Sequence, residues 1–154
     1  MKQSAKRVGL FLLVLITVCV FSASVIADTY RYPSTLDNRY EVVGNGTLTA
    51  TRASAALTIL DLSDDEYETD FYRYAKVEFQ YYPSAGGGLT TDQRQKSGGD
   101  GYTCTAAAST ATDTHIYSFR YAKFTFQARV PAASGGYHNW SAGSEDWVEF
   151  IPTD

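Results

Sequence analysis

The chain has 154 residues, of which 44% are hydrophobic, 14% aromatic and 19% charged, and it carries a formal net charge of −4. These values exclude collagen-like, low-complexity and coiled-coil proteins, and the length suits one domain rather than two. The excess of acidic residues disfavours binding to the phosphate backbone of nucleic acids, so we expect no nucleic-acid partner.

The N-terminus has the layout of a secretory signal peptide. Its positively charged start consists of Lys2, Lys6 and Arg7. Residues 8–21 form an uncharged apolar run of 14 residues, which is shorter than the ~20 residues that a helix needs to cross a bilayer. A Val-Ile-Ala segment then ends at Ala27. We therefore expect residues 1–27 to be removed and residues 28–154 to form one secreted, extracellular domain without an integral membrane segment.

Residues 28–154 have the composition of a β protein that is held together by packing. Threonine, tyrosine, valine and phenylalanine are abundant, glycine and serine fill the gaps, and no stretch shows a sustained helical period. Cys104 is the one cysteine in this part of the sequence. A small secreted domain that depends on disulfides would carry an even number of cysteines.

The segments predicted to be strands are, in chain order, 40–43, 47–60, 71–82, 102–109, 115–130 and 146–151. The strand at 47–60 opens just after Gly44-Asn45-Gly46, which is a strong turn signal. Strands at this spacing, separated by Gly/Ser/Pro loops, indicate an antiparallel two-sheet β-sandwich.

Two of these segments alternate with a period of two, which predicts one buried and one exposed face. The side chains expected on the buried face are Ala75, Val77, Phe79 and Tyr81 in the first segment, and Ala122, Phe124, Phe126, Ala128 and Val130 in the second. Burial of Val77, Phe79, Phe124 and Phe126 is expected to stabilise the fold by ~1.5–3 kcal/mol each.

The same two segments contain an internal repeat. Arg73-Tyr74-Ala75-Lys76 with Phe79-Gln80 recurs as Arg120-Tyr121-Ala122-Lys123 with Phe126-Gln127. A weaker match, Thr49-x-Thr51-x-Ala53 against Thr103-x-Thr105-x-Ala107, precedes the two copies. We interpret the pattern as a duplicated strand–loop–strand unit with its copies about a pseudo-twofold axis; the alternative is convergent strand chemistry. The basic residues of the repeat are expected to pair with carboxylates on the surface, which would contribute little to stability.

The face opposite the predicted core is aromatic, and it is the candidate binding surface. Its members, together with a tryptophan near the C-terminus, are Tyr72, Tyr74, Tyr117, Phe119, Tyr121 and Trp140. Flat apolar rings can stack on sugar rings while tyrosine hydroxyls form hydrogen bonds, and an exposed apolar patch usually marks an interaction site. The alternatives are that another segment covers these rings and that Trp140 plugs one end of the sandwich.

An acidic segment at 61–70 offers oxygen ligands to a hard cation such as calcium. Its carboxylates are Asp61, Asp64, Asp65, Glu66, Glu68 and Asp70. The spacing lacks the Asp-x-Asp-x-Asp-Gly run of an EF-hand. We therefore expect a solvated connection and no cofactor, and calcium binding is the alternative.

The sequence contains no nucleophilic-serine, zinc or phosphate-loop motif. Cys104, His138 and Asn139 are the residue types of a thiol hydrolase, but an isolated cysteine is more often a small buried residue. The expected function is therefore non-catalytic: binding of a glycan or surface polymer at or outside the cell envelope. The alternatives are a self-associating structural protein and a small bacteriocin-like toxin.

Overall fold

The computed structural model describes residues 27–82, 88–98, 101–109 and 120–150. Their strands are β1 (Asp28–Leu36), β2 (Tyr40–Leu48), β3 (Arg52–Asp61), β4 (Glu66–Tyr67), β5 (Tyr72–Tyr81), β6 (Thr90–Ser97), β7 (Cys104–Ser109), β8 (Arg120–Pro131), β9 (Tyr137–Gly143) and β10 (Val148–Phe150). No helix in these ranges could cross a membrane. All but the last residue of the predicted signal peptide lies outside the described residues.

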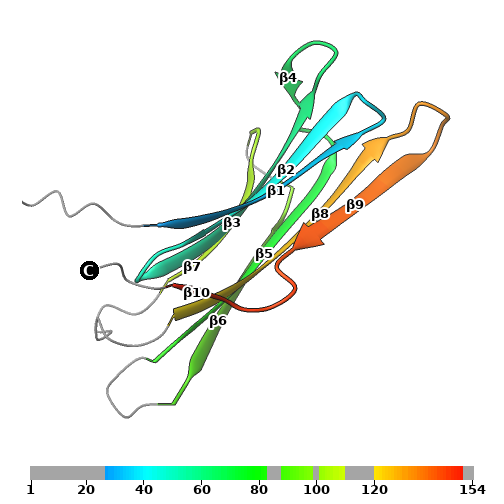
Figure 1. The fold of residues 1–154 in the computed structure, drawn as a ribbon. Helices are drawn as coiled ribbons and strands as arrows, with labels where there is room; N and C mark the ends of the chain where they lie inside the picture. The colour runs from blue at the N-terminus through cyan, green and yellow to red at the C-terminus, as the bar shows by residue number, and fades with distance from the viewer. Residues whose placement is uncertain (1–26, 83–87, 99–100, 110–119, 151–154) are drawn as a thin grey trace, which may run out of the picture.

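The strands form two antiparallel sheets that pack face to face (Figure 1). Sheet A has the order β1-β2-β3, with β7 and β4 both paired to the other edge of β3. Sheet B has the order β6-β5-β8, with β9 and β10 both paired to the other edge of β8. The prediction of an all-β, two-sheet antiparallel sandwich is confirmed.

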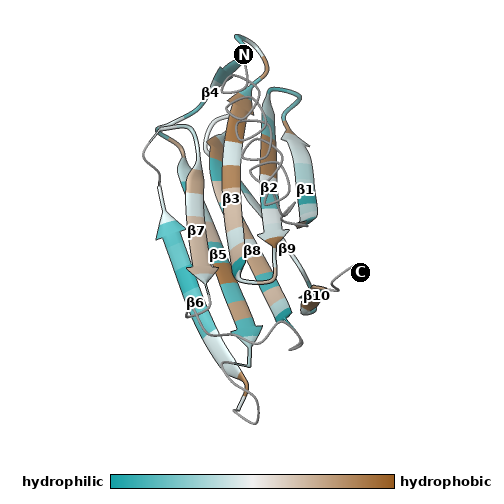
Figure 2. Ribbon diagram, turned by 90° about the vertical axis from the view of Figure 1, so that its left-hand side faces the viewer, coloured by the Kyte–Doolittle hydropathy of each residue, from teal (hydrophilic) through white to brown (hydrophobic). Residues whose placement is uncertain are grey.

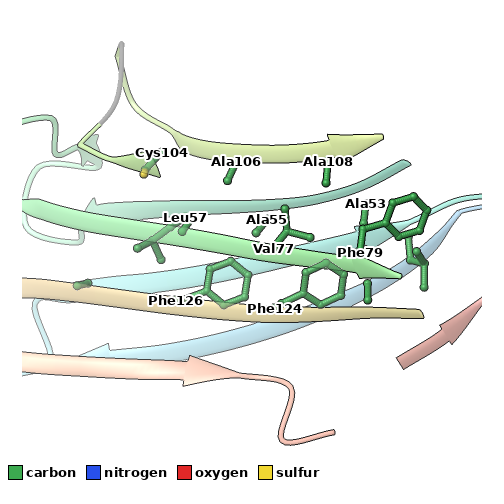
Figure 3. Packing of buried hydrophobic residues seen from close by; sticks show 14 of the residues in the cluster. Ala53, Ala55, Leu57, Val77, Phe79, Cys104, Ala106, Ala108, Phe124 and Phe126 are labelled. Carbon is green, nitrogen blue, oxygen red and sulfur yellow. The ribbon is translucent and has the colours of Figure 1, made fainter. Parts of the chain in front are cut away.

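The core lies between the two sheets, and the predicted alternation supplies its sheet B half. Val77, Phe79, Phe124 and Phe126 are fully buried, as the sequence predicts. Figure 3 shows these rings and Val77 facing a row of small side chains from sheet A. That row consists of Ala53 and Ala55 in β3 and Ala106 and Ala108 in β7, all of them buried. Rings on one sheet and methyl groups on the other fill the space between the layers.

The two copies of the repeat lie side by side, in β5 and β8 at the centre of sheet B. Their antiparallel register places each repeated alanine opposite a repeated phenylalanine, and each repeated tyrosine opposite a repeated glutamine. The pairs are Ala75–Phe126, Phe79–Ala122, Tyr74–Gln127 and Gln80–Tyr121. The pattern R-Y-A-K-x-x-F-Q is thus complementary to itself across a local twofold axis.

The connections around this pair follow the same local symmetry. β5 forms a hairpin with β6, and β8 forms one with β9. The weaker match does not follow it, because Ala53 is buried on the inner face while Ala107 lies on the other face of β7. A common origin of the two copies stays a prediction.

The turn predicted at Gly44-Asn45-Gly46 is wrong, because this tripeptide lies inside β2. A Cβ atom on Gly46 would lie 2.5 Å from a ring carbon of Phe124, and one on Gly44 would lie 2.6 Å from a ring carbon of Phe126. The two glycines therefore leave the space that the rings of Phe124 and Phe126 occupy. The chain reverses instead at residues 49–51, where the Thr49 hydroxyl accepts a hydrogen bond from the Arg52 amide at 3.0 Å.

The rings of the first strand complete this packing. Tyr30 is paired with Gly46 in the register of β1 and β2, and its ring centre lies 5.7 Å from that of Phe124. Tyr32 is paired with Gly44 and stands 5.5 Å from Phe126. Each missing side chain in β2 is thus replaced by rings from β1 and β8.

Strands β1, β6 and β9 were not among the predicted elements. β1 contains Pro33, which an edge strand tolerates, and β6 is polar along almost its whole length (Figure 2). Three of the β6 positions paired with core residues of β5 carry charges, at Asp92, Arg94 and Lys96. Inward charges on an edge strand discourage pairing with another chain.

The arginines of the repeat are buried rather than paired at the surface, which corrects the sequence expectation. Arg73 is fully buried, and its Nη1 and Nη2 atoms donate to the carbonyl oxygens of Tyr102 and Thr69, both at 2.7 Å. Arg120, at the other end of the β5–β8 pair, donates from Nε to the carbonyl of Ala50 at 2.7 Å. Burial lowers the pKa of Arg120. Each arginine thus holds connecting segments of the chain against the core through hydrogen bonds to their carbonyl groups.

Candidate functional site

A shallow groove of about 290 Å³ lies at one end of the outer face of sheet B. We call it the tyrosine–arginine groove; it is lined by Tyr72, Gln127, Ala128, Arg129, Asn139, Trp140 and Ser141. The antiparallel register sets Tyr72 of β5, Arg129 of β8 and Asn139 of β9 in one row across the sheet. In Figure 1 these three strands lie next to one another.

Arg129 lies between two tyrosine rings. Its guanidinium carbon is 5.9 Å from the ring centre of Tyr72 and 5.7 Å from that of Tyr137 in β9. Its Nε donates a hydrogen bond to Oδ1 of Asn139 over 3.1 Å. Cation–π contacts at exposed sites contribute ~0.5–1 kcal/mol each, so they orient the guanidinium while leaving it in solvent.

The side of the groove formed by β9 is fixed to the opposite sheet by Asp37, in the turn between β1 and β2. Its Oδ2 accepts a hydrogen bond from the amide of Ala133 at 2.8 Å, and its Oδ1 lies 2.8 Å from Nε2 of His138. The Ala133 amide first, and then His138, lower the pKa of Asp37. Because His138 lies between Tyr137 and Asn139, these contacts set the position of Asn139 in the groove and of Tyr137 beside it.

The structure separates the aromatic candidates predicted from sequence. Tyr72 is exposed in the groove, whereas the Tyr74 hydroxyl donates to Oε1 of Gln95 in β6 at 3.0 Å. Tyr121 lies eight residues from Arg129 along β8, about 26 Å at the rise of an extended strand. Trp140 packs against the core and also lines the groove, so both interpretations of this residue stay predictions. Tyr117 and Phe119 lie outside the described residues.

Sequence reasoning missed Arg129 and Tyr137, and it considered Asn139 only for a thiol hydrolase and not for a binding site. The alternation of side chains along β8 places Arg129 on the same outward face as Tyr121, and could have indicated this residue. Tyr137 and Asn139 depend on the pairing of β9, and β9 was not a predicted strand. The Pro/Ala/Ser/Gly loop after β8 was the available signal for this hairpin.

In the acidic segment, Asp61 is a structural residue. It is buried, and its Oδ2 accepts hydrogen bonds from Nη2 and Nε of Arg39 at 2.7 and 2.9 Å. Its Oδ1 accepts from the amide and hydroxyl of Ser63 at 2.9 and 2.6 Å. The hydrogen bonds from Arg39, followed by those from Ser63, hold the pKa of Asp61 well below its usual range. Both of its oxygens are thus engaged within the protein.

The other carboxylates of this segment do not gather at one point. Oδ1 of Asp64 accepts a hydrogen bond from the amide of Glu66 at 3.2 Å, and Oδ1 of Asp70 accepts from the Thr69 hydroxyl at 3.2 Å. Burial, and then the charges of Asp61 and Asp64, raise the pKa of Glu68. Across the described residues, no three His, Cys, Asp or Glu side chains are placed to hold a metal ion.

Cys104 and His138 lie on opposite sides of the sandwich. The Cys104 thiol is buried and donates to the carbonyl of Lys96 in β6 at 3.2 Å, while His138 belongs to β9. Strands β5 and β8 separate β6 from β9. Burial also raises the pKa of the Cys104 thiol, which disfavours a nucleophilic thiolate.

The sequence matches no known protein-family model and no curated protein.

Proposed function

We propose that this protein is a secreted, non-catalytic binding protein that recognises a glycan or surface polymer at or outside the cell envelope, through the tyrosine–arginine groove. The observation that carries the proposal is the arrangement of Tyr72, Arg129 and Tyr137. It presents two exposed phenol rings on either side of an ordered cation, next to an open groove.

The chemistry of the groove suits a sugar. The apolar face of a pyranose packs against an aromatic ring, and its hydroxyls need donors and acceptors at fixed positions. Amides of Gln127 and Asn139 and the hydroxyl of Ser141 line the same groove. A shallow, open site of this kind is accessible to a residue within a polymer as well as to a chain end.

Self-association is the alternative function, and the edge strands bear on it. On β6, Asp92 and Arg94 form an ion pair with Oδ1 and Nε 3.1 Å apart. Placing a second chain against this edge would disturb charged, solvated groups. This observation disfavours assembly through the β6 edge.

The test is retention of the purified protein on immobilised polysaccharides, comparing two double variants. Tyr72→Ala/Tyr137→Ala removes both rings beside Arg129, and we expect binding to weaken about tenfold or more, since each aromatic contact contributes ~0.5–1.5 kcal/mol. The matched control is Tyr67→Ala/Tyr102→Ala, a pair of tyrosines 49% and 60% exposed with ring centres 5.7 Å apart.

The control pair lies outside the groove, so its removal should leave retention unchanged. Equal retention of both double variants would contradict the assignment of the site. Absence of retention on every polysaccharide, together with concentration-dependent oligomers in light scattering, would favour the self-association alternative.

A further inference from the structure

Arg129 differs from many other basic residues of the protein in having no acidic partner. Arg31, Arg39, Lys76 and Arg94 each form an ion pair with a carboxylate. Among the described residues, no carboxylate lies within ion-pair distance of Arg129, although the chain has 17 acidic residues and 13 basic ones. A cation left unpaired in an acidic protein is available to an external anion.

The groove also lacks any acidic side chain. Its lining combines Arg129 with amide, hydroxyl and aromatic groups, so the local charge is positive although the protein as a whole is negative. Charges more than about 8 Å away are largely screened at physiological ionic strength. No carboxylate belongs to this lining, so Arg129 is the charged side chain that a negatively charged group in the groove would meet.

The orientation of the guanidinium favours a planar anion. Nε is already engaged with Asn139, and the rings of Tyr72 and Tyr137 lie on either side. The edge formed by the two terminal nitrogens has no partner among the described residues. Two parallel N–H groups on one edge match the two oxygens of a carboxylate.

Resting on the proposed function, we propose that the groove selects carboxylate-bearing sugars, and that Arg129 is the residue that determines this specificity. A uronic acid residue would place its carboxylate against the terminal nitrogens of Arg129 and its ring against Tyr72 or Tyr137. The amides of Gln127 and Asn139 would then face the sugar hydroxyls.

The test compares two polymers that differ only in the charged group: polygalacturonic acid and its methyl ester. We expect the wild-type protein to bind the acid about tenfold or more tightly than the ester, as for a charge-assisted bidentate pair. Arg129→Gln is expected to abolish this preference while leaving weak binding to both polymers. Arg129→Lys keeps the charge but loses the paired donors, so an intermediate preference is expected.

Lys123→Gln is the matched control, because Lys123 lies on the same face of β8 outside the groove. It is expected to keep the wild-type preference, and melting curves verify that each variant is folded. Dextran sulfate is the third polymer, and equally tight Arg129-dependent binding to it would overturn carboxylate selection in favour of simple charge attraction.

The outcomes separate the two proposals. If the wild-type protein binds acid and ester equally, and Tyr72→Ala/Tyr137→Ala abolishes both, the binding function stands and carboxylate selection is wrong. If neither these polymers nor any neutral polysaccharide is retained, the proposed function itself fails.

Discussion

Gly44→Ala and Gly46→Ala are each expected to destabilise the protein, by about 1–3 kcal/mol as for overpacked cores. The decisive part of this prediction is that the unfolding free energy falls rather than rises. Glycine inside a strand is ordinarily unfavourable by ~0.5–1 kcal/mol relative to alanine, so propensity alone predicts stabilisation. Steric overlap of the new methyl group with the rings of Phe124 and Phe126 opposes this gain. Chemical denaturation at 25 °C measures the difference in unfolding free energy.

Asn45→Ala is the control, since Asn45 lies between the two glycines with its side chain on the outer face. It is expected to change stability only slightly. The double variant Gly46→Ala/Phe124→Leu should lose less stability than the sum of its single changes, because the smaller side chain leaves room for the new methyl group. A Gly46→Ala protein as stable as the wild type would show that the Phe124 ring does not rest on this backbone.

Arg73→Ala is expected to lower the unfolding free energy by ~3–5 kcal/mol, in the range of large-to-alanine changes in cores. The substitution opens a cavity and removes the donors of the carbonyl groups of Thr69, Gly101 and Tyr102. Arg73→Met keeps most of the side-chain volume, so it removes the hydrogen-bond donors without opening a large cavity. We expect a smaller loss of unfolding free energy for it, about 1–3 kcal/mol.

Arg52→Ala provides the comparison, because Arg52 is an exposed arginine at the start of β3. We expect little change for this variant. Hydrogen exchange gives a second readout, in which the amides near Tyr102 should exchange faster in both Arg73 variants and at the wild-type rate in Arg52→Ala. Equal stability of Arg73→Ala and Arg52→Ala would contradict the structural role of the buried guanidinium.

The sequence predicts β5 and β8 well for a physical reason. Each lies between two neighbours in sheet B and packs one face on the core, so its side chains alternate strictly. β2 could not be predicted in the same way, since Asn45-Gly46 is a favoured hairpin pair. Its glycines are explained only by Phe124 and Phe126, which approach from β8 in the other sheet.

The candidate site was predictable only in part. The alternation of inward and outward side chains along β5 predicts that Tyr72 lies on the outer face, and this alternation is visible in the local sequence. Arg129, Tyr137 and Asn139 come together through the register of three strands, and no local pattern determines that register. The same applies to Arg73, whose parity indicates an inward position but whose carbonyl partners lie in distant connections.

One measurement tests the groove most directly: nitration of tyrosines by tetranitromethane, mapped by mass spectrometry with and without saturating polygalacturonic acid. In the free protein, Tyr72 and Tyr137, 44% and 65% exposed, are expected to react, while the buried Tyr40 is not. With the polymer bound, Tyr72 and Tyr137 should be protected and Tyr67 and Tyr102 should react as before. Unchanged nitration of Tyr72 and Tyr137 under conditions where the polymer is bound would contradict the account.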